Sequence, residues 1–242
     1  MYAYFHCGPL HQLFPLCAEL FVEYLNALID SLNKAIKYTK RSTDRLRKPL
    51  QLIDYLLSKV NVLIRCGGED KEEIEKILDD LKKLIVTNCQ ENSKYEKNYY
   101  MTNALYATHI LGDYEKMMKN VILADRISSK TSTSELQVID EIYVPYAYML
   151  CTFEKYDSAL IWLDCSIKLC DSKLNIPQYV RKKLELHSHK IDVYDIMEDY
   201  TKCKEEIILI DELNEKYKEQ GIYIDILDEI KDRVQAHTKK TE

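Results

Sequence analysis

Cysteine and histidine are the residue types in this chain with the greatest chemical reactivity, and four of them gather near the N-terminus. They are His6, Cys7, His11 and Cys17. Imidazole and thiolate groups are ligands that zinc prefers. The four positions share a helix face only loosely, however, and their spacing matches no zinc motif. The sequence therefore predicts no metal site here.

Nucleophilic and cofactor-dependent catalysis has no sequence signature in this chain. There is no GxGxxG, Walker loop, HExxH or GxSxG motif, and each of those motifs would place a specific chemical group at a strand or helix end. A nucleophile pair such as Cys151 with His109 would require a tertiary contact that the sequence does not support. His187 and His189 are two residues apart, so on a helix they point to different faces. We expect a protein that is not an enzyme and holds no cofactor.

Composition indicates a helical fold. Only five Gly and five Pro occur in 242 residues, fewer than tight turns between strands normally require. The eight cysteines form no CxxC pair, and most lie in apolar helical runs, which fits a reducing compartment. The most apolar window, Leu13 to Leu32, is interrupted by Glu19, Glu23 and Asp30. Neither a signal peptide nor a membrane span is expected, and the predicted location is cytoplasmic.

Apolar periodicity divides the chain into helices joined by short turns. Apolar positions three and four apart form one face between Leu10 and Tyr38. Pro49 can open the next helix, and Gly67-Gly68 can end it. The same kinds of signal predict an N-terminal helical segment at 1–48, four helix pairs at about 49–86, 99–127, 133–170 and 177–217, and a C-terminal capping helix and tail at 218–242.

Local signals also predict where two of the later helices begin. Ser132 followed by Glu135 has the spacing of a capping box, which places a helix start near Thr133. Gly221 precedes another apolar pattern, so the closing helix is expected from Ile222 to about Val234.

The helix pairs repeat at a nearly constant distance. The residue three positions into each second helix is Ile74, Met117, Ala159 or Cys203, separated in turn by 43, 42 and 44 residues. A period above about 40 residues with two helices per unit is typical of a solenoid, in which each repeat buries its apolar faces against its neighbours.

The run Leu111-Gly112-Asp113-Tyr114-Glu115-Lys116 resembles the helix-to-helix turn of the tetratricopeptide family, and its tyrosine recurs as Tyr156 and Tyr200. The resemblance implies an all-α fold, a right-handed superhelical stack of antiparallel helix pairs. It also implies small or medium residues, such as Ala159 and Cys203, where the helices approach most closely. The period exceeds the family's usual value of about 34, as in the extended repeats of bacterial peptide-sensing regulators. Lys190 departs from the pattern by replacing an apolar residue.

In that family the first helix of each pair lines a concave surface that selects a ligand. Carried over by position, the surface consists of Thr102, Asn103, Tyr106, His109, Glu141, Tyr148, Asp192 and Asp195. Of the Lys, Arg and Asn residues that would hold a carboxylate tail, only Asn103 is present. Aromatic and acidic side chains suit instead a peptide with basic and apolar residues. The sequence thus predicts a protein- or peptide-binding scaffold, as the regulatory or sensor module of a bacterial signalling protein.

Two alternatives use the N-terminal segment. A homo-oligomeric structural adaptor would use the long amphipathic stretch Leu10–Ile36 to contact a second copy. A nucleic-acid-associated regulator would use the basic segment at 34–48, although the net charge of −6 argues against it.

Overall fold

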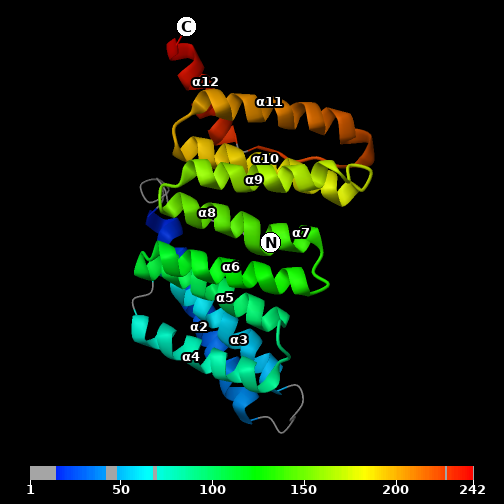
Figure 1. Ribbon diagram of the computed structural model, residues 1–242. Helices are drawn as coiled ribbons and strands as arrows, with labels where there is room; N and C mark the ends of the chain where they lie inside the picture. The colour runs from blue at the N-terminus through cyan, green and yellow to red at the C-terminus, as the bar shows by residue number, and fades with distance from the viewer. Residues whose placement is uncertain (1–14, 42–47, 68–69, 227, 242) are drawn as a thin grey trace. The chain divides into compact units, whose positions relative to one another are not determined.

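A computed structural model of the chain describes residues 15–41, 48–67, 70–226 and 228–241. Over these residues every regular element is a helix (Figure 1), which confirms the expected all-α class. No helix within these ranges is long and apolar enough to cross a membrane. The chain divides into two compact units, Met1–Ile127 and Ser128–Glu242.

The first unit is built around α3. Its elements are α2 (Pro15–Arg41), α3 (Lys48–Arg65), α4 (Lys71–Asn88), α5 (Lys94–Tyr106), the π-helical stretch η1 (Ala107–Leu111) and most of α6 (Tyr114–Lys130). Helix α3 packs against α2, α4 and α5. It supplies the fully buried Ile53 and Val60, which meet Ile74 and Leu81 of α4. The core of this unit therefore follows the three-to-four spacing of apolar residues along α3 and α4.

Helix ends in the first unit follow local capping chemistry. Gly67 adopts a positive φ of 90° after α3, as expected from its place at the helix end. The Asp70 carboxylate accepts a hydrogen bond from the Glu73 amide at 2.8 Å and so starts α4. Helix α5 begins at Lys94, earlier than the predicted Tyr99, because the Ser93 hydroxyl accepts a bond from the Glu96 amide.

The second unit is a succession of helices that pack on their neighbours in chain order. Its elements after α6 are α7 (Glu135–Val138), the π-helical stretch η2 (Ile139–Tyr143), α8 (Val144–Thr152), α9 (Tyr156–Asp171), α10 (Pro177–Ile196), α11 (Tyr200–Tyr217), the 3-10 turn η3 (Lys218–Gln220) and α12 (Asp228–Thr241). Helix α9 packs on α8 and α10, α10 on α11, and α11 on α12. Helix α10 also contacts α8. The buried core joins Leu184 and Ile191 of α10 to Ile210 of α11.

The capping box that opens α7 lies two residues later than predicted. Ser134, rather than Ser132, is the N-cap. Its hydroxyl accepts a bond from the Gln137 amide at 3.3 Å, and the Gln137 side chain accepts one from the Ser134 amide at 3.1 Å. The sequence holds two overlapping Ser-x-x-Glu/Gln patterns, and the protein uses Ser134 with Gln137 in place of the predicted Ser132 with Glu135.

The closing helix begins at Asp228, so the predicted start at Ile222 is wrong. The Asn214 side-chain amide donates to the carbonyl oxygen of Ile224 at 2.8 Å, and its oxygen accepts from the Ile224 amide at 3.1 Å. Asn214 thereby satisfies the backbone of a non-helical segment. Ile222 and Ile226 are buried on either side of this contact, which anchors the segment against α11.

Three helix-to-helix turns share one backbone conformation. Gly112, Glu154 and Glu198 each have a positive φ, of 62°, 57° and 57°. A tyrosine follows two residues later in each case, at Tyr114, Tyr156 and Tyr200. The residues spaced by the predicted period, Ile74, Met117, Ala159 and Cys203, are all fully buried. The local turn geometry and the burial pattern thus recur along the chain.

Candidate functional site

Tyr148, His189 and Asp192 meet where α10 contacts α8. The Tyr148 hydroxyl lies 2.5 Å from Asp192 Oδ2 and 2.8 Å from His189 Nδ1. The Tyr148 and His189 rings are edge to face, with centroids 5.5 Å apart. Tyr148 is only 8% exposed, whereas the His189 and Asp192 side chains are 28% and 36% exposed. The cluster thus has a buried tyrosine at its base and two polar groups open to solvent.

The two short contacts of the Tyr148 hydroxyl determine which groups of this cluster donate hydrogen bonds. An ionised carboxylate can only accept hydrogen bonds, so the Tyr148 hydroxyl donates a hydrogen bond to Asp192. The second short contact then requires His189 Nδ1 to carry a proton and donate to the tyrosine oxygen. His189 Nε2 then acts as an acceptor in the neutral ring or as a donor in the protonated ring. The site therefore presents a carboxylate and an imidazole side by side.

Cys151 lies one helical turn from Tyr148 on α8 and is buried. Burial raises the pKa of its thiol to about 12, and the charge of Asp192 adds to the rise. Only a thiolate is an effective nucleophile or metal ligand. At neutral pH Cys151 therefore acts as a small apolar side chain beneath the site.

Two other residues predicted for the surface of this unit are placed differently. Asp195 forms a two-point ion pair with Arg233 of α12, at 2.9 and 2.6 Å. Its charge is therefore already compensated within the chain. Glu141 lies in η2 and is half-buried. Of the second unit's predicted residues, the structure brings Tyr148 and Asp192 into direct contact.

In the first unit, two of the predicted binding residues are buried. Tyr106 is almost completely enclosed, and its hydroxyl donates to Glu75 Oε1 at 2.7 Å. Burial and this carboxylate raise the pKa of Tyr106. Thr102 is also buried. Both side chains contribute to helix packing and offer little surface to a ligand.

The other two predicted residues of the first unit are more open. The Asn103 side chain is half-buried and donates to the Tyr99 carbonyl oxygen at 2.9 Å. His109 is exposed on η1. They remain candidates for contact with a ligand of this unit.

Sequence reasoning missed a buried charge network across α9, α10 and α11. Glu206 Oε2 lies 2.6 Å from His187 Nδ1, and Glu206 Oε1 lies 2.5 Å from Lys190 Nζ. Lys190 also reaches Asp164 Oδ1 at 3.0 Å. The signal in the sequence was Lys190 itself, a charged residue at a position expected to be apolar.

Mutual hydrogen bonding stabilises the charged forms of this network. Burial alone would raise the pKa of Glu206, but the hydrogen bonds from His187 and Lys190 outweigh it and lower the pKa. For Lys190, burial opposes the charge, yet bonds to Glu206 and Asp164 raise its pKa. Because its main members are buried, the network joins helices and is not positioned to meet a ligand.

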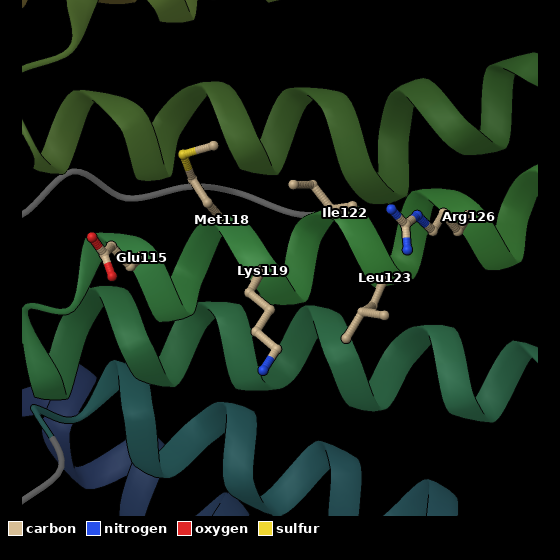
Figure 2. A pocket seen from close by; sticks show the side chains of 6 residues that line it. All are labelled: Glu115, Met118, Lys119, Ile122, Leu123 and Arg126. Atoms are coloured by element: carbon tan, nitrogen blue, oxygen red, sulfur yellow. The ribbon is translucent and has the colours of Figure 1, made fainter.

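A shallow hollow follows one side of α6 in the first unit (Figure 2). Its lining residues are Glu115, Met118, Lys119, Ile122, Leu123 and Arg126. In the close view, which looks onto this face, Met118 and Ile122 lean toward one edge of it, while Lys119 and Leu123 lean toward the other. The lining groups do not converge on a common point, so the hollow lacks the polar focus of the Tyr148 cluster.

Several predicted features fall wholly or partly outside the described residues. His6, Cys7 and His11 lie there, and the side chain of Cys17 is also not described. Elsewhere in the described ranges no group of three or more His, Cys, Asp or Glu could hold a metal ion. The basic segment is interrupted at 42–47 in the same way, but Lys48 Nζ donates to the Lys40 carbonyl oxygen at 2.8 Å.

Comparison with family models, curated proteins and solved structures finds no match to this chain.

Proposed function

We propose that the chain is a tetratricopeptide-like helical scaffold that binds a peptide segment with basic and apolar side chains. The observation that carries the proposal is the half-exposed cluster of Tyr148, His189 and Asp192. Its members come from α8 and α10, the first helices of successive pairs, which would face a ligand if the chain follows the tetratricopeptide pattern. The scaffold would serve as the regulatory or sensor module of a signalling protein.

The recurring turn and burial pattern supports the repeat part of this proposal. Glu154 and Glu198 adopt the left-handed conformation that Gly112 adopts in the turn most similar to the family. Ala159 and Cys203 are fully buried at the predicted close contact, and Cys203 Sγ lies 3.7 Å from the Ile191 carbonyl oxygen. Successive pairs linked in this way move against their neighbours at low cost, which suits a ligand sensor.

The chemistry of the ligand follows from the charges at the cluster. The Asp192 carboxylate is held in place by the Tyr148 hydroxyl, so it is oriented before a ligand arrives. A lysine or arginine side chain can form a charge-assisted hydrogen bond with it. The partly exposed ring of His189 offers a face against which an apolar side chain of the ligand can pack. Because Asp195 is paired with Arg233, we assign the ligand's basic group to Asp192.

Selection from a random peptide library displayed against the immobilised protein tests this function. Selected peptides should be enriched in Lys or Arg together with apolar residues. Their affinity, measured by fluorescence polarisation, should fall about tenfold for Asp192→Asn and for Tyr148→Phe. The first change removes the charge, and the second removes the hydroxyl that orients it.

Asp171→Asn is the matched control, because Asp171 is a surface carboxylate of the same unit that pairs with Lys183 away from the cluster. It should leave peptide affinity unchanged. Peptides without charge bias, or equal affinities for wild type and Asp192→Asn, would contradict the proposal.

A further inference from the structure

Helix α11 carries a stripe of apolar and charged residues that its own unit covers only in part, with Ile207 half-buried and Ile208 exposed. On its inner side Cys203 and Ile210 are fully buried against the core. On its outer side Ile208 is 49% exposed. A shallow hollow runs along this side between α11 and α12, lined by Lys204, Ile207, Ile208, Asp211, Lys231, Val234 and Gln235. Helix α11 packs on α10 and on α12, which follows it at the C-terminal end of the chain (Figure 1).

The stripe has a positive charge at one end, a negative charge at the other and apolar residues between them. Lys204 and Asp211 are two helical turns apart, with Ile207 and Ile208 between them. Both charged residues are exposed, and within the described part of the chain neither takes part in an ion pair. Lys231, by contrast, lies 3.9 Å from Asp228 of its own helix.

The charges of this stripe match those of a second, antiparallel copy of the same stripe. Two copies of α11 packed antiparallel about a point between Ile207 and Ile208 would place Lys204 of each copy opposite Asp211 of the other. The two isoleucines of each copy would meet at the centre. The next charged residue along the stripe, Glu215, would lie opposite the uncharged Tyr200 in this antiparallel arrangement.

The distances involved fit such a pairing. Lys204 and Asp211 each lie about 5 Å along the helix from the midpoint, at a rise of 1.5 Å per residue. At the usual separation of 8–10 Å between packed helix axes, both remain within reach of the partner helix at common crossing angles. A two-fold axis requires that one patch match itself in this manner.

We infer that α11 forms a two-fold symmetric interface with α11 of a second copy, centred on Ile207 and Ile208 and framed by reciprocal Lys204–Asp211 pairs. This interface differs from the one expected at Leu10–Ile36. The described part of that stretch is already engaged within its unit, where Leu25 and Ile36 are buried and α2 packs on α3.

Sedimentation velocity of the full chain over a range of concentrations tests the inference. Wild type should dimerise. Lys204→Asp and Asp211→Lys should each weaken the dimer at least about a hundredfold, because each creates two like-charge contacts in the symmetric interface. The double variant K204D/D211K should dimerise again to within about tenfold of wild type. An equimolar mixture of the two single variants should form a mixed dimer, since both of its contacts regain opposite charges.

Lys82→Asp and Asp80→Lys on the exposed side of α4 are matched controls and should leave the dimer unchanged. The mixed dimer also shows that both single variants are folded. A wild-type chain that stays monomeric at the highest concentration overturns the inference. So does a dimer that neither reversal weakens, or a double variant that stays monomeric.

Discussion

At the scale of single residues, the buried charge network shows how this chain tolerates ions inside helix packing. Lys190 and Glu206 lose water, which costs free energy. Each regains hydrogen bonds to charged partners from adjacent helices, and Asp164 at the solvent edge completes the set. The sequence revealed only that Lys190 was out of place, because its partner Glu206 lies on another helix and carries no motif.

Removing the charge of Glu206 leaves the buried His187 without its carboxylate partner and leaves Lys190 with Asp164 alone. We expect Glu206→Gln to lower the free energy of unfolding by about 3–5 kcal/mol at neutral pH, measured by urea denaturation. The folded-state pKa of Glu206 is lowered, so its contribution is complete above its unfolded pKa. It is lost as pH falls through the lower folded value. The difference in free energy of unfolding between wild type and Glu206→Gln should therefore become smaller at acidic pH.

Lys190→Met with Glu206→Leu provides the comparison, because removing both charges should cost less than removing one. A difference between wild type and Glu206→Gln that stays constant from neutral to acidic pH would rule out a charged Glu206 as the source of the effect.

At the scale of elements, helices with strong local signals were predicted closely, and those set by tertiary contacts were not. Helix α3 begins at Lys48, next to the proline expected to open it, and the fourth predicted pair, at 177–217, matches the start of α10 at Pro177 and the end of α11 at Tyr217. The closing helix was predicted too early. Its apolar residues at 222 and 226 also fit a helical spacing, and nothing local shows that Asn214 binds the backbone between them.

Asn214→Ala tests this anchoring contact. Two hydrogen bonds to Ile224 disappear, and its half-buried backbone groups lose their partners, so we expect a loss of about 1–3 kcal/mol. Hydrogen exchange at the Ile224 amide should accelerate. Asn120→Ala is the control, since that half-buried side chain donates to the Lys116 carbonyl oxygen of its own helix and should change stability little. Unchanged protection of Ile224 would show that the buried isoleucines alone hold the segment.

At the scale of the whole molecule, the sequence predicted the helical class better than it predicted the site. Tyr148 and Asp192 were assigned to one surface and lie in contact. His189 was missed, because a histidine on a helix carries no sign of its tertiary neighbours. Tyr106 was assigned to the same surface and is buried, since an aromatic residue on the first helix of a pair can either pack or face a ligand.

The recurrence of one turn conformation along the chain leads to a prediction about equivalent positions. Glu154 and Glu198 hold the left-handed conformation without being glycine, at a cost of about 1–2 kcal/mol each. Replacing either by glycine removes that strain but adds about 0.5–1 kcal/mol of unfolded-state entropy. Glu154→Gly and Glu198→Gly should thus each stabilise the protein by roughly 0.5–1 kcal/mol, measured by thermal unfolding.

Gly112→Ala is the reverse experiment. An added Cβ would meet no atom within 4 Å, so any loss of stability must come from the backbone conformation alone. We expect a loss of about 1 kcal/mol. A gain in stability for Glu154→Gly and Glu198→Gly that equals the loss for Gly112→Ala would mean that the three turns are equivalent parts of one repeat. A Glu154→Gly or Glu198→Gly variant that is less stable than wild type would mean that side-chain contacts particular to that turn outweigh the shared conformation, and that the repeat does not extend to it.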